Sequence, residues 1–78
     1  MSFDYQRLKG KIIEKYNKQS EFAKVMQISE RTLSLKMNGK VAWKQTEIMK
    51  AIRLLDLKET DIQPYFFMIK VQNIERNE

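Results

Sequence analysis

The most constraining feature of the sequence is the stretch from residue 19 to residue 39, which has the pattern of two short helices joined by a tight turn. Ala23 supplies the small side chain that two helices need where they cross at a steep angle. Ser29 is a residue type preferred just before a helix, and Gly39 suits the left-handed conformation just past a helix end. Six apolar side chains are spaced to form one core beneath the crossing: Phe22, Val25, Met26, Ile28, Leu33 and Met37. The stretch therefore predicts a helix-turn-helix.

The charge of the chain makes DNA the leading candidate partner of this motif. A helix-turn-helix places the start of its second helix in the DNA major groove. The chain has 15 basic and 10 acidic side chains. Residues 1–26 carry six basic and three acidic groups, residues 27–45 carry four and one, and residues 46–78 carry five and six. The excess lies around the motif, as expected for phosphate contact, although a lysine-rich surface that only keeps a protein in solution fits the charge equally well.

The composition excludes several other classes of protein. A chain of 78 residues forms one domain, and 42% hydrophobic residues is ordinary for a folded protein. With no cysteine and no histidine, there is no disulfide framework, no thiolate metal site and no base to activate a serine. We therefore expect no enzyme, metal, cofactor or small-molecule substrate. Neither a signal peptide nor a membrane-spanning stretch is present, so we expect a cytoplasmic protein with no membrane contact.

Apolar periodicity and capping residues predict five helices. The first extends from residue 3 or 4 to residue 16, with Ser2 or Asp4 as its cap. Gly10 lies inside it, where it either allows close approach of another backbone or is a tolerated surface glycine. The stripe of this helix consists of Tyr5, Leu8, Ile12 and Tyr16, widened by Ile13. The others are expected at residues 19–26, 30–38 and 45–55, with a short fifth helix capped by Thr60 and containing Pro64 near its first turn.

The C-terminal part concentrates apolar side chains within seven residues: Tyr65, Phe66, Phe67, Met68, Ile69 and Val71. The alternation over residues 67–71 fits a strand or a short extended C-terminal arm. We expect a DNA-binding domain over residues 1–71 that includes a dimerisation segment at residues 64–71, followed by a flexible polar tail at residues 72–78. In the alternative, Phe66 and Ile69 fold back onto the first helix and complete the monomer core.

The chain resembles the lambda-repressor-like (Cro/CI, also called XRE) DNA-binding family over about residues 4–66. The resemblance implies an all-α, compact five-helix domain with a helix-turn-helix. It is specific in the stretch Gln19, Phe22-Ala23, Ile28-Ser29, Leu33-Ser34 and Asn38-Gly39-Lys40. The residues at both ends, Phe3-Asp4-Tyr5 with Leu8-Lys9-Gly10, and Tyr65-Phe66-Phe67, look like small phage-encoded regulators of Gram-positive hosts.

The sequence departs from this family at four places. Gln27 stands where the turn usually has glycine, so we expect it at positive φ. Lys36 stands where the third helix usually has a large apolar residue. Leu35 is apolar at a normally polar, groove-facing position, and the loop at residues 41–44 lacks the usual proline. These departures affect the details of base reading more than the fold.

Four side chains of the third helix are the candidates for reading bases, because they project from the face opposite Leu33 and Met37: Glu30, Arg31, Ser34 and Leu35. Arg31 can pair in bidentate fashion with guanine, or else with a phosphate or Glu30. Glu30 either accepts from cytosine or orients Arg31, and we favour the second. Leu35 either packs on a thymine methyl or is an exposed leucine with no role.

Seven residues are candidates for phosphate contact: Asn17, Lys18, Gln19, Thr32, Asn38, Lys40 and Lys44. The family resemblance implies that Gln19 contacts a phosphate at the start of the second helix, where backbone N–H groups and the helix dipole favour an anion. The alternative is that Gln19 only caps its helix and that the lysines are solvated surface charges. Trp43, in the basic loop at residues 40–44, fits the edge of the core better than a stack on nucleic acid.

The sequence thus favours a sequence-specific transcriptional regulator, a Cro-like repressor that occludes a promoter. One such helix reads few base pairs, so we expect a homodimer on a double-stranded DNA operator, acting in the cytoplasm of a bacterial host and associated with the nucleoid when bound. Two alternatives stay open. One is an antitoxin- or excisionase-like regulator that acts with a protein partner, and the other is a helix-turn-helix protein-interaction module that does not bind DNA.

Overall fold

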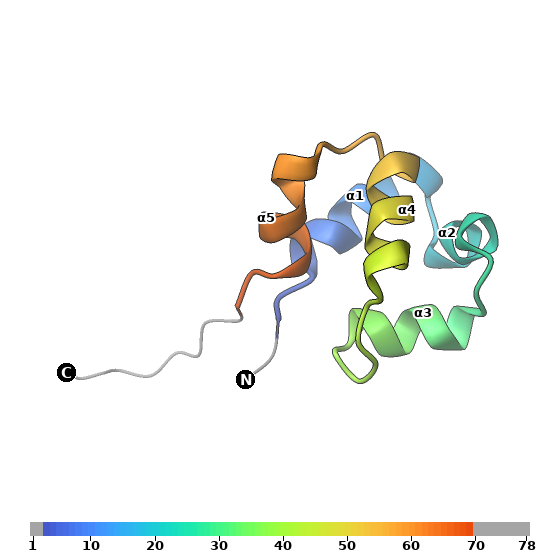
Figure 1. Cartoon of the computed structure of the whole chain (residues 1–78). Helices are drawn as coiled ribbons and strands as arrows, with labels where there is room; N and C mark the ends of the chain where they lie inside the picture. Colours follow the sequence, from blue (N-terminus) through green and yellow to red (C-terminus); the bar gives the residue numbers. More distant parts are fainter. Residues whose placement is uncertain (1–2, 70–78) are drawn as a thin grey trace.

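The computed structural model describes residues 3–69, and in that range the chain is all-α. The helix α3 lies roughly across the base of the view in Figure 1, α4 rises from it, and α5 lies beside the start of α1. No helix within residues 3–69 is long and apolar enough to cross a membrane. The elements are α1 (Gln6–Tyr16), α2 (Gln19–Met26), α3 (Glu30–Met37), α4 (Gln45–Leu54), the 3₁₀ helix η1 (Glu59–Asp61) and α5 (Ile62–Phe66). The predicted five-helix all-α fold is confirmed.

The helix-turn-helix forms as its capping residues predict. Gln27 adopts φ 65°, the left-handed conformation expected where related chains have glycine. Ser29 caps α3, since its Oγ accepts a hydrogen bond from the Thr32 N–H at 3.0 Å. Gly39 has φ 75° just beyond the end of α3. The conformation of the turn and the two ends of α3 were therefore predicted correctly from single residues.

Several expected boundaries are shifted. The helix α1 begins at Gln6 rather than at residue 3 or 4, and its capping position is Tyr5, so the prediction of Asp4 as the cap is wrong. Asp4 Oδ1 still accepts from the Gln6 N–H at 2.9 Å. Thr60 lies inside η1 and caps nothing, so the predicted cap of the fifth helix is wrong. A Cβ built on Gly10 meets no atom within 4 Å, which makes it a tolerated surface glycine.

One hydrophobic core lies between all five helices. The predicted positions Phe22, Met26 and Leu33 are buried, and Ile28 and Met37 pack against the core from its edge. Val25 is 38% exposed and Ile13 is 41% exposed, so the expectation that both belong to the core is wrong. The buried apolar residues are Leu8, Ile12, Phe22, Ala23, Met26, Leu33, Ile48, Ala51, Ile52, Leu55 and Phe66.

The two ends of the described chain pair with each other. Phe3 and Ile69 form an isolated antiparallel bridge, and the Asp4 N–H donates to the Met68 carbonyl at 2.6 Å. Phe66 is 1% exposed and belongs to the core, whereas Ile69 is 48% exposed. The alternative in which this segment completes the core is therefore confirmed for Phe66 and wrong for Ile69. The dimerisation segment at residues 64–71 stays a prediction. Residues 70–78, which include Val71 and the predicted tail, lie outside the described residues.

The helix α4 holds both helices of the motif through polar contacts. Lys50 Nζ donates to the Met26 carbonyl at 3.3 Å and to Gln27 Oε1 at 2.9 Å. A cation there meets the negative end of α2 and fixes the side chain of the left-handed turn residue. One turn earlier on α4, Glu47 Oε1 lies 2.8 Å from Lys36 Nζ on α3. The positions of α2 and α3 therefore both depend on α4.

Lys36 is a buried charge, with only 2% of the residue exposed. Its stem occupies the core position where an apolar residue was expected, and its ammonium also donates to the Ala42 carbonyl at 2.9 Å. The Trp43 ring centroid lies 5.9 Å from Nζ. Glu47 in turn accepts from the Lys44 N–H at 2.8 Å, which ends the loop before α4. The ion pair thus takes the place of apolar packing and of the missing proline in this loop.

Ala23→Leu should destabilise the fold without altering any surface side chain. Ala23 is 1% exposed at the contact of α2 with the core, and overpacking typically costs about 1–3 kcal/mol. Thermal unfolding followed by circular dichroism should show a clearly lower Tm. Val25→Leu on the exposed side of the same helix is the control and should leave Tm nearly unchanged. An unaltered Tm in Ala23→Leu would show that the crossing tolerates a larger side chain.

Glu47→Gln should lower the unfolding free energy by about 3–5 kcal/mol at pH 7, because it leaves the buried Lys36 ammonium uncompensated. Burial raises the pKa of the Glu47 carboxyl, but its hydrogen bonds and charge interactions with Lys36 and Lys44 outweigh burial and hold the pKa below its ordinary value. A depressed carboxyl pKa stabilises the fold above the unfolded-state pKa, and this contribution is lost as the pH falls through the folded-state pKa.

Denaturant unfolding from pH 7 down to about pH 3 measures this effect. The difference between the original chain and Glu47→Gln should shrink toward the acid end. Glu21→Gln, which alters a surface carboxylate paired with Lys24, is the matched control and should shift stability little. A pH-independent gap between the original chain and Glu47→Gln would contradict the assignment of the stabilisation to the ion pair.

Candidate interaction surfaces

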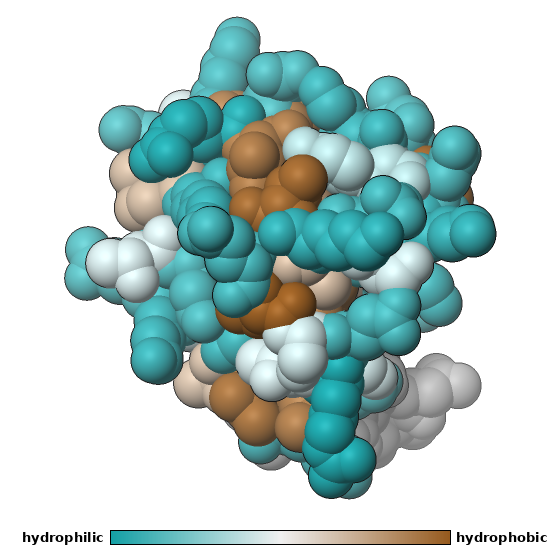
Figure 2. Space-filling view, turned by 90° about the vertical axis from the view of Figure 1, so that its right-hand side faces the viewer, coloured by the Kyte–Doolittle hydropathy of each residue, from teal (hydrophilic) through white to brown (hydrophobic). Residues whose placement is uncertain are grey.

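The structure presents two surfaces that differ in chemistry. The first is the polar face formed by the start of α2 and the outer side of α3, where the sequence predicts contact with DNA. The second is an apolar surface formed by α4, α5 and the paired ends of the chain. Figure 2 views the side on which α2 lies and shows hydrophilic side chains surrounding smaller hydrophobic patches.

Three of the four predicted base-reading residues are exposed on α3. Glu30, Arg31 and Ser34 are open to solvent, and no ion pair joins Arg31 to Glu30 within residues 3–69. Leu35 is half-buried, so less of its side chain is available for a thymine methyl than the sequence suggests. The Ser29 cap orders the first turn of α3, which is the part that enters a groove in the docking of this motif.

The predicted phosphate-contacting residues form a less uniform set. Lys18, Lys40, Lys44 and Asn17 are exposed on the loops that flank the motif. Thr32 is half-buried, and its hydroxyl accepts from Ser29 Oγ at 2.9 Å. Both Thr32 and Asn38 are thus partly occupied inside the protein, because the Asn38 side-chain amide donates to the Ser34 carbonyl at 2.9 Å.

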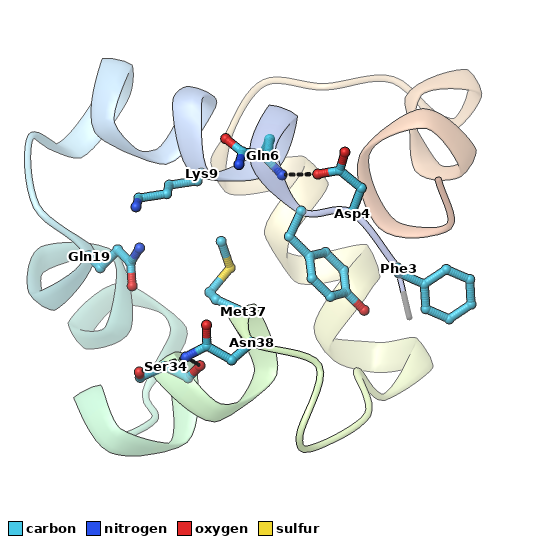
Figure 3. A pocket seen from close by; sticks show the side chains of 9 residues that line it. Phe3, Asp4, Gln6, Lys9, Gln19, Ser34, Met37 and Asn38 are labelled. Carbon is cyan, nitrogen blue, oxygen red and sulfur yellow. Dashed lines mark hydrogen bonds between the residues drawn. The ribbon is translucent and has the colours of Figure 1, made fainter. Parts of the chain in front are cut away.

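Gln19 lies in a polar cleft of about 440 Å³ between the start of α1, the start of α2 and the end of α3. Figure 3 shows Lys9 extending from α1 toward Gln19, with Ser34, Met37 and Asn38 on the opposite wall. No side chain caps α2, whose preceding residue Lys18 is extended. Lys9 is a residue that the sequence reading missed. Only the fold brings it to the start of α2.

Four lysines form ion pairs within residues 3–69, and none of them is among the residues predicted to contact DNA. Lys36 is buried against Glu47, Lys24 lies 3.4 Å from Glu21, and Lys11 lies 3.7 Å from Glu14. Lys15 pairs with Asp56, which lowers the pKa of the Asp56 carboxyl and raises that of the Lys15 ammonium. Burial of Lys36 therefore removes one cation from the surface, while Lys18, Lys40 and Lys44 stay exposed.

The apolar surface gathers five of the large hydrophobic side chains that are exposed in residues 3–69: Phe3, Met49, Phe67, Met68 and Ile69. Beside them, a groove of about 390 Å³ is lined by Trp43, Gln45, Ile48, Met49, Ile62 and Phe67. Trp43 packs edge-on against Phe66, with ring centroids 5.1 Å apart, so its predicted place at the edge of the core is confirmed. The indole Nε1–H of Trp43 is buried with no hydrogen-bond partner among the described residues.

Two further residues have roles that the sequence did not predict. Lys50 contacts Gln27, and Lys36 is an internal cation rather than a surface one. A lysine at a core position of a helix, with a glutamate eleven residues later at the start of the next helix, was the available signal. Residues 3–69 contain no group of acidic side chains placed to hold a metal ion.

Comparison with solved structures finds a close relative. The solution structure of the modulator of repression (MOR) of the temperate bacteriophage TP901-1 from Lactococcus lactis matches with a TM-score of 0.77 and 54% sequence identity. The match covers 92% of this chain and 97% of that chain. No protein with a curated description matches the sequence.

The relationship supports a small phage regulator, in agreement with the resemblance seen at the two ends of the sequence. The family model that matches the chain is not that of the Cro/CI group. That model is described as a protein of unknown function (DUF739) and matches residues 1–69. The chain therefore belongs to the DUF739 family.

Proposed function

We propose that this chain regulates phage gene expression by binding a repressor protein and changing how that repressor acts. The observation that carries the proposal is the 54% identity, over 92% of this chain, to a protein named as a modulator of repression. Repression requires a protein that occupies an operator. A small partner can change that occupancy by contacting the repressor, with no catalytic or second domain of its own.

The apolar surface, rather than the charge, supports a protein partner. A motif that binds DNA by itself gains most of its affinity from free lysines and arginines on phosphates. Here Lys36 is buried in an ion pair and is unavailable to phosphate, whereas Lys18, Lys40 and Lys44 are exposed and form no ion pair within residues 3–69. At the same time, a group of large apolar side chains is exposed at the other end of the molecule, which is typical of a protein interface.

A direct test is isothermal titration calorimetry of this chain with the purified repressor encoded in the same genome. We expect a saturable complex, and we expect the operator affinity of the repressor to change when the chain is added. The chain titrated with operator duplex alone is the second arm. Tight operator binding by the chain with no binding to the repressor would overturn the proposal.

Sequence-specific DNA reading by α3 is the second candidate function. It is favoured by the exposed Arg31 in the first turn of α3 and by the Ser29 cap that orders this turn. In that case Glu30, Arg31, Ser34 and Leu35 read bases, and Asn17, Lys18, Gln19, Thr32, Asn38, Lys40 and Lys44 position the backbone. Two copies then bind a two-fold-related operator as a Cro-like repressor. Of the predicted dimerisation segment at residues 64–71, the structure describes residues 64–69, and in that part Phe67, Met68 and Ile69 are exposed.

If α3 reads DNA, Arg31→Ala should cost roughly 1–3 kcal/mol at the preferred site and relax sequence preference at one position. Lys40→Ala should weaken binding to all duplexes alike and make the salt dependence shallower by about 0.9 per lost phosphate contact. Fluorescence anisotropy with specific and random duplexes over a salt series measures both effects. Equal loss on both duplexes in both variants would contradict base reading by Arg31, and a slope shallower than about −2 would contradict the phosphate footprint.

A further inference from the structure

We propose that the groove between α4 and α5 is the site at which the repressor docks, through an amphipathic helix that inserts a large apolar side chain and places a carboxylate beside Arg53. This inference rests on the proposed function and names the surface that performs it. The polar face of α3 is then free in the complex.

The groove has the size and composition of a receptor for apolar side chains. Its volume is about 390 Å³, and five of its six lining residues are apolar, with Gln45 the exception. Helices α4 and α5 supply opposite walls, an arrangement that suits a third helix laid between them. Met49 is 38% exposed and Phe67 is 42% exposed in the free chain, so a partner would remove substantial apolar area from water.

The walls of the groove are already held in place. Trp43 is fixed by edge-on contact with Phe66 at 5.1 Å and by the Lys36 ammonium 5.9 Å from its ring. Phe67 packs edge-on against Phe3, with ring centroids 5.6 Å apart. Because the contacts with Phe66 and Lys36 order Trp43 before binding, this wall loses little side-chain entropy when a partner enters. The ion pair inside the fold therefore supports the Trp43 wall, whereas the position of the Phe67 wall depends on the pairing of the chain ends.

The charges decide which occupant fits. Arg53 lies one turn beyond Met49 on the exposed side of α4 and forms no ion pair within residues 3–69. None of the six groove-lining residues is acidic. All six lining residues are uncharged, so the lining of a second copy offers no carboxylate to Arg53. A repressor helix can supply that carboxylate next to its apolar anchor.

The experiment compares matched variants for binding to the purified repressor of the same genome by calorimetry. Met49→Glu should weaken binding roughly tenfold or more, because it places a charge at the centre of the apolar contact. Arg53→Glu should cause a smaller loss and a changed salt dependence. Val25→Glu is the control, because Val25 on α2 is also 38% exposed but lies outside the groove. Circular dichroism checks that each variant is folded.

A second measurement reports on the groove directly. Trp43 is the only tryptophan, so 5-fluorotryptophan labelling gives a ¹⁹F signal from the groove wall that the repressor does not obscure. The signal should shift on adding the repressor to the original chain or to Val25→Glu. Under the same conditions it should stay in place for Met49→Glu.

The outcomes separate this inference from the proposed function. If the original chain does not bind the repressor at all, the proposed function fails. If it binds, but Met49→Glu binds equally well and the Trp43 signal does not move, the repressor docks elsewhere and this inference is wrong. If the chain alone sediments as a dimer that Met49→Glu dissociates, the groove belongs to a second copy, and the inference is equally overturned.

Discussion

The arrangement of this fold depends on two polar contacts made by one face of α4. Glu47 and Lys50 lie three residues apart, and they reach α3 and the end of α2 respectively. A motif of two eight-residue helices has little apolar area of its own, so its geometry must be set by what packs behind it. Polar contacts with defined donors and acceptors fix orientation in a way that apolar contacts do not, since the latter tolerate sliding.

The buried ion pair between Lys36 on α3 and Glu47 on α4 has an energetic cost and a structural benefit. Desolvating Lys36 and Glu47 consumes much of the attraction between them, so the pair adds less stability than its 2.8 Å contact suggests. The benefit is specificity of arrangement. The Lys36 ammonium has three acceptor-like neighbours, which are Glu47, the Ala42 carbonyl and the Trp43 ring, and together they define the path of the loop between α3 and α4. That loop supplies a wall of the apolar groove.

Capping residues, turn residues and apolar periodicity predicted most of the fold. They failed where the position of a residue depends on a contact with a distant part of the sequence. The left-handed Gln27, the Ser29 cap and the burial of Leu33 each follow from a few neighbouring residues. Val25 was wrongly assigned to the core. A helix of eight residues makes only about two turns, so its apolar spacing does not define how wide the buried side is. The role of Lys36 could not be read from its neighbours, because a lysine is normally a surface residue and its partner lies on another helix. For the candidate site, the exposure of Glu30, Arg31 and Ser34 on α3 was predicted correctly. The apolar groove is assembled from two stretches, residues 43–49 and 62–67, so no single stretch of sequence indicates it.

The pairing of the chain ends has a consequence for how the molecule opens. The bridge between Phe3 and Ile69 is an isolated pair at the two ends of the described residues, and both side chains are exposed. Such a contact is expected to form last during folding and to break first in local fluctuations. The Asp4 amide, which donates across this pairing, should therefore exchange its hydrogen through small openings, whereas amides beside Leu8 and Leu33 should exchange only on global unfolding. The exposed aromatic end of the protein is thus also the part with the least protection against transient opening, and a partner that covers it would slow exchange at both ends of the chain at once.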